Sequence, residues 1–314
     1  MTKVFIDGKA GTTGLKIYDR LLERTDLELL TLPEELRKDT AARKEILNKA
    51  DIAFLCLPDG AAREAVSLIE NPDTVVIDTS TAHRTNPDWA YGFPELSENF
   101  LEKIKTSKRI AVPGCHASGF IALVYPLVSK GIISKDTLLN CFSLTGYSGG
   151  GKQMIADYED ENRDSQLSSP RQYGLSQTHK HIPEMCAVTG INVAPAFCPI
   201  VGDFYSGMQV TVPLHKSQLS EGYGIEDVKN AYKELYKDAM VTYTDSMDES
   251  GFVSSNALSG FDNMQISVAG NEERILLLAR YDNLGKGASG AAVECMNIAL
   301  GIDKTTSLLI KDVK

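Results

Sequence analysis

The chain has 314 residues, 43% hydrophobic and 24% charged, which is typical of a soluble protein and sufficient for two domains with their own cores. The net charge of −10 argues against a general attraction to nucleic acid or anionic membranes. No apolar stretch is long enough to span a bilayer, and a strand pattern at Val4 leaves no room for a signal peptide. The six cysteines are widely spaced, without a CxxC pair. This spacing argues against structural zinc and disulfides and favours a reducing cytoplasm.

A glycine-rich turn follows the first predicted strand, Val4-Phe5-Ile6, and precedes a helical pattern over 15–22. Glycines let the backbone approach a pyrophosphate, and the helix N-terminus supplies N–H groups. The spacing is GxxGxxG, which differs from the usual GxGxxG, so an ordinary βα turn remains an alternative for this segment by itself. The candidate cofactor contacts of the turn are Gly8, Gly11, Thr12, Thr13 and Gly14.

Strands and helices alternate over the first third of the chain. Strand patterns at 27–32, 52–57, 74–78 and 110–112 are separated by helical patterns at 40–49 and 61–69. The alternation predicts an α/β domain with a Rossmann-type, doubly wound parallel sheet, whose ligands bind at the carboxyl ends of the strands. Further candidate cofactor contacts at such ends are Leu57, Pro58 and Ser80.

The residues after the second strand bear on the choice of cofactor. Arg37 and Lys38 are placed to bind the 2′-phosphate of NADP, whereas Glu34 or Glu35 could bind the ribose 2′-hydroxyl of NAD. A solvent-exposed helix start is the alternative explanation for the two basic residues. We expect NADP(H).

Cys115 follows a Pro-Gly turn and leads into an apolar run over 120–125 that is typical of a helix. A thiol at a helix N-terminus faces main-chain N–H groups and the positive end of the helix dipole, which predicts a pKa below the roughly 8.5 of an ordinary thiol. The thiolate is a nucleophile that can hold an acyl group as a thioester. A small buried apolar side chain is the alternative.

The pattern changes after Phe120. Strand-like runs at 139–144, 208–214 and 274–279 predict an α+β substrate domain with a mixed or antiparallel sheet. The glycine cluster between Gly146 and Lys152 can direct main-chain N–H groups at an anion, although a mobile loop would look the same.

His179 and His181 lie two residues apart, so in an extended segment they point to the same side. With Glu184 nearby, one of them could be a general acid/base oriented by a carboxylate. H-x-H also occurs in metal sites, but no third ligand lies nearby in the sequence, and we expect no metal.

Small residues after Asp282 begin a final helix that is expected through about Ala299, with Asn283 as a candidate cofactor contact. We expect a nucleotide-binding domain over 1–114, with the C-terminal helix of 285–314 packing back on it. The catalytic domain is expected over 115–284.

The chain resembles the N-acetyl-γ-glutamyl-phosphate reductase family, in its shorter form, over nearly its whole length. The most specific segments are Tyr-Gly-Phe-Pro-Glu-Leu at 91–96 and His-Lys-His-Ile-Pro-Glu at 179–184; Pro-Gly-Cys at 113–115, the Gly146–Lys152 loop and Asp282–Ala288 also match. The longer form of the family typically has Tyr-Pro where this chain has His116-Ala117, and Arg where it has Lys180. Both departures fit the shorter form.

The resemblance implies a semialdehyde dehydrogenase-like fold and NADPH-dependent reductive dephosphorylation of N-acetyl-γ-glutamyl phosphate in arginine biosynthesis. It implies that Cys115 attacks the acyl phosphate, phosphate leaves and the thioester accepts a hydride, with proton transfer by His179 or His181 and orientation by Glu184. Candidates for holding phosphate or the substrate carboxylate are Arg84, Tyr147, Ser148 and Lys152. Arg84 could equally be a structural ion-pair partner. The family also implies a homo-oligomer, a dimer or tetramer.

Three alternatives remain at this point. Aspartate-semialdehyde dehydrogenase performs the same chemistry on a shorter substrate, but we expect its histidine in a different place. A non-catalytic nucleotide-sensing Rossmann protein would need no activated thiol. An acylating aldehyde dehydrogenase would depend on coenzyme A in place of phosphate.

Overall fold

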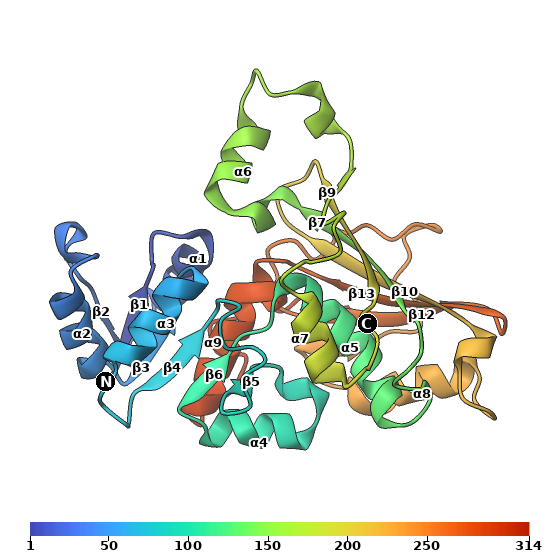
Figure 1. Cartoon of the computed structure of the whole chain (residues 1–314), viewed down its shortest axis with the longest axis horizontal. Helices are drawn as coiled ribbons and strands as arrows, with labels where there is room; N and C mark the ends of the chain where they lie inside the picture. The colour runs from blue at the N-terminus through green and yellow to red at the C-terminus, as the bar shows by residue number, and fades with distance from the viewer. Residues whose placement is uncertain (314) are drawn as a thin grey trace. The chain divides into compact units, whose positions relative to one another are not determined.

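The structure is a computed structural model, and it describes residues 1–313 (Figure 1). The chain divides into two compact units. The first unit contains Met1–Pro94, Glu98–Gly114 and Ala288–Leu308, and the second contains Glu95–Ser97, Cys115–Gly287 and the segment from Leu309.

The first unit is built on a parallel sheet, which within the described residues has six strands in the order β2-β1-β3-β4-β6-β5. The strands are β1 (Thr2–Asp7), β2 (Leu27–Leu30), β3 (Ile52–Leu55), β4 (Val75–Asp78), β5 (Ala90–Tyr91) and β6 (Arg109–Ala111). The order reverses at β1, so the doubly wound parallel sheet that the alternating pattern predicts is confirmed.

Helices cover both faces of this sheet, since successive strand residues point to opposite sides. Val4 and Ile6 belong to one buried cluster with side chains of α1 (Thr12–Leu21), α4 (Glu98–Thr106) and α9 (Gly290–Ala299). Phe5 belongs to the other, with side chains of α2 (Thr40–Lys49) and α3 (Asp59–Leu68). The two layers hold the carboxyl ends of the strands, where the glycine turn lies, in fixed positions.

The C-terminal segment is more divided than the helix expected over 285–314. A π-helical turn, Gly285–Ser289, precedes α9, and α9 ends at Ala299. The portion that belongs to the first unit is Ala288–Leu308. Leu309 belongs to the second unit, where Asp262 donates its main-chain N–H to the Leu309 oxygen at 2.7 Å.

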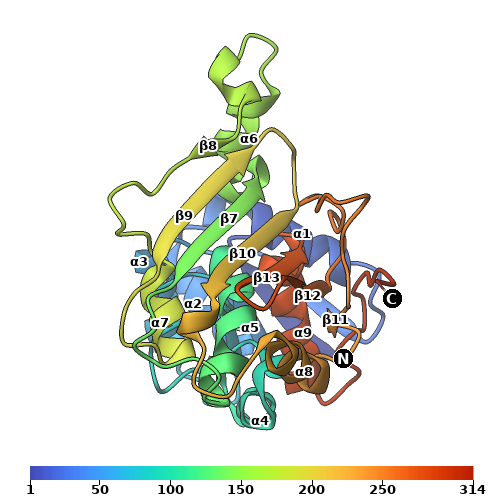
Figure 2. The same ribbon diagram turned by 90° about the vertical axis from the view of Figure 1, so that its right-hand side faces the viewer.

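The second unit has a mixed sheet, as the strand-like runs after Phe120 predict. Among the described residues its strand order is β11-β12-β13-β10-β7-β9-β8, with β7 parallel to β9, β11 parallel to β12, and the other neighbours antiparallel. The strands are β7 (Asn140–Gly146), β8 (Arg171–Gln172), β9 (Ala196–Gly202), β10 (Met208–His215), β11 (Val241–Tyr243), β12 (Met264–Gly270) and β13 (Arg274–Tyr281). Figure 2 shows β9, β7, β10, β13 and β12 side by side.

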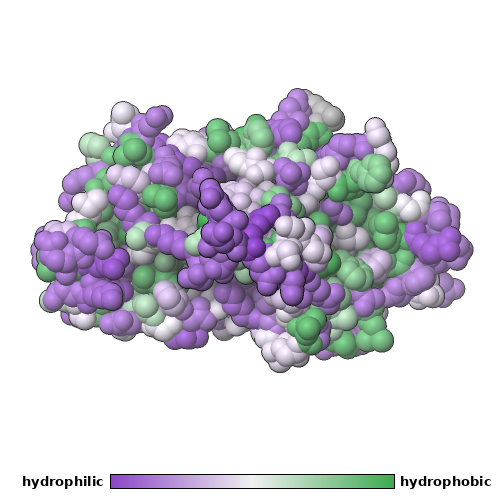
Figure 3. Space-filling view, turned by 90° about the horizontal axis from the view of Figure 1, so that it is seen from above, coloured by the Kyte–Doolittle hydropathy of each residue, from purple (hydrophilic) through white to green (hydrophobic). Residues whose placement is uncertain are grey.

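One face of this sheet packs against α5 (Cys115–Ser129), which contacts β10, β13, α7 (Ile182–Thr189) and α8 (Ile225–Leu235). Most of α5 is buried, as expected of a helix that is apolar on all sides. The segment with α6 (Gly151–Glu159) extends beyond the ends of β7 and β9 (Figures 1 and 2) and presents mainly hydrophilic atoms (Figure 3).

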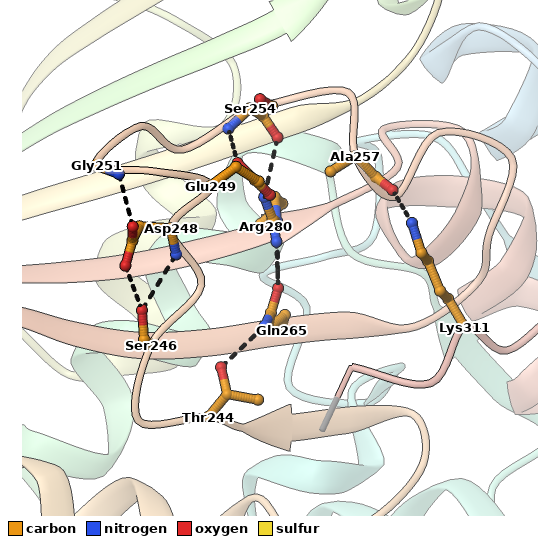
Figure 4. Close-up of polar contacts among 10 residues, drawn as sticks. All are labelled: Thr244, Ser246, Asp248, Glu249, Gly251, Ser254, Ala257, Gln265, Arg280 and Lys311. Carbon is orange, nitrogen blue, oxygen red and sulfur yellow. Dashed lines mark hydrogen bonds and ion pairs between the residues drawn. The ribbon is translucent and has the colours of Figure 1, made fainter.

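A polar network fixes the loop after β11 to the strands β12 and β13 (Figure 4). Arg280 donates to Gln265 Oε1 from Nε at 3.2 Å and from Nη2 at 2.8 Å, and it pairs with Glu249. Gln265 in turn donates to Thr244 Oγ1 at 2.9 Å, and Ser254 donates its N–H to Glu249 at 2.9 Å. The buried guanidinium therefore has partners on both the sheet and the loop, as burial of a charge requires.

Candidate active site

The glycine turn of the first unit borders a cavity of about 640 Å³. Its lining includes Val4–Ala10, Leu15, Tyr18, Leu29–Leu32, Glu34, Arg37, Lys38 and Leu57. Gly8 has φ +87°, and a Cβ there would lie 2.3 Å from the Cys56 oxygen. A Cβ on Gly14 would lie 2.5 Å from the Gly8 oxygen. Only glycine fits at these positions, and the turn keeps its backbone open to a ligand, so the residues present fit a dinucleotide.

The rest of the turn leads into α1. Gly11 is the N-cap of α1 and makes no side-chain cap, so the N–H groups of Thr12 and Thr13 point toward the loop without a side-chain competitor. Leu57 lines the cavity, and Pro58 precedes α3 as its N-cap.

Basic and acidic side chains meet at the edge of the cavity that β2 and the following turn form. Arg37 pairs with Glu34 at 2.8 Å, and both side chains are largely exposed. A 2′-phosphate would compete with Glu34 for this guanidinium, whereas a 2′-hydroxyl would use the carboxylate. The edge of the cavity therefore carries both of the charged groups that the sequence predicts to distinguish NADP from NAD.

Ser80 and Arg84, two other predicted site residues of the first unit, make hydrogen bonds to the segments that follow β4 and β6. Ser80 donates its hydroxyl to Asp78 at 2.7 Å. Arg84 is buried and donates to two main-chain oxygens, that of Val112 at 2.8 Å and that of Thr79 at 2.9 Å. These bonds connect the segments that follow β4 and β6. Arg84 therefore has a structural role in connecting these segments, and its contact with the substrate stays a prediction.

Cys115 is the first residue of α5 in the second unit and is partly exposed. Tyr281 donates its hydroxyl to the Cys115 main-chain oxygen at 2.5 Å and accepts from the Gly119 N–H at 3.0 Å. A Cβ on Gly119 would lie 2.7 Å from that hydroxyl, and one on Gly287 would lie 3.1 Å from the Cys115 Cβ. Two glycines thus make room for the tyrosine and for the π-helical turn beside the thiol.

His179 and His181 lie edge to face, with ring centroids 4.8 Å apart, just before α7. His181 donates its N–H to His179 Nδ1 at 3.2 Å and is the N-cap of α7. Glu184 is buried in the first turn of that helix. Burial and the charge of Lys180 lower the pKa of His179, so its imidazole is neutral at pH 7 and is suited to accept a proton.

His116, which the sequence did not identify as functional, belongs to the same cluster. Its ring centroid lies 5.6 Å from those of both His179 and His181. Its Nδ1 lies 2.7 Å from Ser143 Oγ and its Nε2 lies 2.6 Å from the Tyr173 hydroxyl. Burial, with the charges of His179 and Lys180, lowers the pKa of His116 to about 3.

Burial, and then the charge of Cys115, raises the pKa of both Tyr173 and Tyr281. No local pattern in the sequence singles out either tyrosine, because both lie on segments remote from the thiol along the chain. The position of His116 directly after Cys115 was the one local signal.

The predicted anion-binding loop lies at the end of β7. Tyr147 stacks on Tyr158 with centroids 4.7 Å apart, and Lys152 is exposed at the start of α6. Ser148 is buried and accepts from Asn283 Nδ2 at 3.0 Å, while Asn283 Oδ1 accepts from the Gly207 N–H at 2.9 Å. Asn283 therefore fixes this loop from within the second unit, and its role toward the cofactor stays a prediction.

In the described part of the chain, neither a metal-binding cluster nor a membrane-spanning helix is found. Residues 1–313 contain no group of three or more His, Cys, Asp or Glu side chains that could hold a metal ion. They also contain no helix long and apolar enough to cross a membrane.

The cavity with its glycine turn, and a thiol at a helix N-terminus in a unit with a mixed sheet, define the semialdehyde dehydrogenase class. Residues 3–104 match the family described as semialdehyde dehydrogenase, NAD binding domain, and residues 115–283 match its dimerisation domain. The fold is similar to aspartate semialdehyde dehydrogenase II of Vibrio cholerae, with a TM-score of 0.72 and 16% identity over 96% of this chain and 98% of that one. It is also similar to the Candida albicans enzyme with NADP, with a TM-score of 0.68, 16% identity, and 95% and 98% coverage.

Curated relatives specify the family within this class. The chain is 44% identical to N-acetyl-gamma-glutamyl-phosphate reductase of Sinorhizobium medicae, over 95% of this chain and 98% of the relative. It is 45% identical to the Brucella ovis protein of the same name, over 95% and 99%. The chain belongs to the N-acetyl-gamma-glutamyl-phosphate reductase family, as the motifs at 91–96 and 179–184 predict.

Proposed function

We propose that this chain catalyses the NADPH-dependent reductive dephosphorylation of N-acetyl-γ-glutamyl phosphate to N-acetylglutamate 5-semialdehyde, a step of arginine biosynthesis. The observation that carries the proposal is the position of Cys115 at the N-terminus of α5, directly before His116, whose ring lies 5.6 Å from those of both His179 and His181 in the same unit. The family of its curated relatives specifies the substrate.

In the proposed mechanism the Cys115 thiolate attacks the acyl carbon, and the C–O bond to phosphate breaks as inorganic phosphate leaves. The first turn of α5 supplies N–H groups and a positive dipole end that stabilise the negative charge on sulfur. The resulting thioester is activated for reduction. The cavity of the first unit, lined by the glycine turn and Arg37, would hold NADPH, which would supply the hydride when bound.

Reduction of the thioester carbonyl places a negative charge on its oxygen, and collapse then breaks the C–S bond and restores the thiolate. In the reverse direction, attack on the aldehyde forms a thiohemiacetal whose hydroxyl proton must be removed. We assign this proton transfer to the His179–His181 pair, with Glu184 in the first turn of α7 as the orienting carboxylate.

Binding of phosphate and of the substrate carboxylate is assigned to Arg84, Tyr147, Ser148 and Lys152. The exposed ammonium of Lys152 is the one of these groups whose charge contacts solvent directly, since Arg84 and Ser148 are buried. Cofactor contacts are assigned to the glycine turn with Arg37, Lys38, Leu57, Pro58, Ser80 and Asn283.

A homodimer through the second unit is also proposed. The sheet face opposite α5 exposes Phe142 (45%) and Leu276 (40%). Register brings Cys198 beside Phe142 and Pro213 beside Leu276. Exposed and partly exposed apolar side chains on neighbouring strands are typical of a protein interface, and residues 115–283 match a dimerisation domain. A cytoplasmic location accords with cysteines that form no disulfides among residues 1–313.

The test is to trap the acyl-enzyme. The protein is incubated with N-acetyl-γ-glutamyl phosphate without NADPH, digested with trypsin and analysed by mass spectrometry of the 110–130 peptide, which contains Cys115 and no other cysteine. The proposal predicts release of phosphate and an N-acetylglutamyl adduct on this peptide. Adduct formation with aspartyl phosphate in its place would assign the chain to aspartate-semialdehyde dehydrogenase activity.

A further inference from the structure

Arg171, in the short edge strand β8, carries a positive charge that no carboxylate neutralises within residues 1–313. Its guanidinium makes one hydrogen bond there, from Nη2 to the Tyr158 hydroxyl at 3.0 Å, and its Cζ lies 5.4 Å from the centroid of that ring. Its Nε is buried and has no hydrogen-bond partner in the same range. A guanidinium has five N–H donors, so most of those of Arg171 remain available to an anion.

Other arginines of the second unit have carboxylate partners. Arg163, which precedes Arg171 on the same segment, pairs with Asp203 at 2.6 Å. Arg280 pairs with Glu249. The chain has an excess of acidic residues, with a net charge of −10, so carboxylates are not scarce. Since a partly buried charge is costly without a counter-charge, the arrangement around Arg171 suits an anionic ligand.

The strand register places Arg171 on the face of the sheet that carries the histidine cluster. Arg171 pairs with Val201, and Val201 pairs with Thr145 on β7. Paired residues share a face of a sheet, and so do residues two apart on one strand. Ser143, two residues before Thr145, has its Oγ 2.7 Å from His116 Nδ1. The Arg171 side chain therefore belongs to the same face as the one that His116 contacts.

Tyr173 connects Arg171 with this cluster more directly. Its main-chain N–H donates to the Pro199 oxygen at 3.0 Å, which continues the pairing of β8 with β9. Residues two apart on an extended strand point to the same side and lie about 7 Å apart. The Tyr173 hydroxyl lies 2.6 Å from His116 Nε2, and His116 directly follows Cys115. One tyrosine and one histidine thus separate Arg171 from the nucleophile along this path.

The candidate anion-binding loop, Gly146–Lys152, lies on the other side of Arg171. Tyr158, which accepts the hydrogen bond from Arg171, stacks on Tyr147 of this loop with ring centroids 4.7 Å apart. Arg171 therefore contacts the aromatic stack that supports the loop, and it is also the strand neighbour of Tyr173. Its guanidinium is placed where a ligand held by the loop and the histidine cluster would lie.

We propose that Arg171 binds the substrate carboxylate, the one on the carbon that bears the acetamido group, and thereby selects substrates that carry it. A guanidinium matches the two oxygens of a carboxylate. Phosphate is bonded to the carbon that Cys115 attacks, whereas this carboxylate is three carbon atoms away. Arg171, which Tyr173 and His116 separate from Cys115, fits the remote group. The inference rests on the proposed function, which supplies the substrate.

The test compares two aldehydes that differ only in this carboxylate, N-acetylglutamate semialdehyde and 4-acetamidobutanal, as reductants of NADP in the presence of phosphate. Arg171→Met keeps a long unbranched side chain and removes the charge. We expect kcat/KM for the first aldehyde to fall about tenfold to a hundredfold and that for the second to stay within about twofold. The KM for phosphate is expected to be unchanged. Arg163→Met, the matched control, removes a guanidinium that Asp203 already neutralises, and it should leave the selectivity unchanged.

Arg171→Lys keeps the charge without the fork and is expected to retain part of the selectivity, which also covers a loss of folding in Arg171→Met. Equal losses on both aldehydes would show that Arg171 acts through packing. A raised KM for phosphate with the selectivity intact would show that it binds phosphate. Either result would overturn the proposal. Failure of the proposed function is a separate result, namely a wild type that does not oxidise N-acetylglutamate semialdehyde.

Discussion

The hydroxyl of Tyr281 donates a hydrogen bond to the main-chain oxygen of Cys115 at 2.5 Å. The same hydroxyl accepts from the Gly119 N–H at 3.0 Å, so it stands where the first turn of α5 would otherwise close on itself. Strand β13 thereby helps to fix the main chain at Cys115, since Tyr281 is its last residue.

Tyr281→Phe removes the hydroxyl that bridges the Cys115 carbonyl and the Gly119 N–H. We expect the free energy of unfolding in urea to fall by about 1–3 kcal/mol. We also expect kcat to fall about tenfold, because the thiol loses its fixed position, with KM within about twofold. Tyr243→Phe, at a tyrosine whose hydroxyl faces the exposed Asp245, is the matched control. Unchanged stability and kcat in Tyr281→Phe would show that β13 does not position Cys115.

Gly14→Ala places a Cβ 2.5 Å from the Gly8 oxygen, whereas Gly60→Ala, also in the first unit, meets nothing within 4 Å. We expect the first substitution to distort the glycine turn and to weaken NADPH binding at least tenfold, and the second to have no effect. Isothermal titration with NADPH measures both. Alkylation of Cys115 serves as a folding control for the second unit and should be unchanged. Equal affinity in the two variants would place the dinucleotide elsewhere.

Arg37→Ala removes the guanidinium that lies at the cavity edge beside Glu34. The affinity for NADPH is expected to fall about tenfold, with that for NADH unchanged or improved, because only NADPH carries the 2′-phosphate. Lys44→Ala removes the same charge from an exposed pair with Glu70 in the same unit, and should leave the ratio of the two affinities as it is. A ratio that stays constant in Arg37→Ala would remove this residue from the choice of cofactor.

The buried His116 predicts a specific pH dependence of stability. Its pKa falls from 6.5 to about 3 on folding, so between these values the unfolded chain binds a proton that the folded chain excludes. Its contribution to stability is therefore present above pH 6.5 and is lost as the pH falls. The loss amounts to about 2 kcal/mol between pH 7 and pH 5.

His116→Gln keeps a polar side chain and removes this titration. Urea unfolding at pH 7 and pH 5 should show a decrease in stability in the wild type that exceeds the decrease in the variant by about 2 kcal/mol. His179, whose pKa is also lowered, contributes to both proteins and cancels in the difference. Parallel decreases would mean that His116 is protonated in the folded state.

The sequence specifies the first unit well, because a parallel sheet covered on both faces produces continuous apolar strands that local patterns reveal. Ile52–Leu55 and Val75–Asp78 are such strands, each buried along its whole length. The pattern missed β5, which has two residues and relies on pairing with β6. It also missed the π-helical turn before α9, whose small residues match a helix start equally well.

The candidate site is less evident from the sequence than the fold, because its contacts join segments that are distant along the chain. The bond between Tyr281 and Cys115 spans 166 residues, and that between His116 and Tyr173 spans 57. No periodicity records such pairs. The histidine pair could be singled out because two polar residues two positions apart share a side in an extended segment, whereas His116 lies in an apolar helix and looks like part of the core.

We have proposed that Cys115 is the nucleophile of a phosphate-dependent semialdehyde dehydrogenase. The direct measurement is reduction of NADP by N-acetylglutamate semialdehyde, followed at the nicotinamide absorbance band, with and without phosphate, in wild type and Cys115→Ser. We expect activity that requires phosphate and that falls by at least about a thousandfold in the variant. Activity that survives the substitution, or that needs no phosphate, would contradict it.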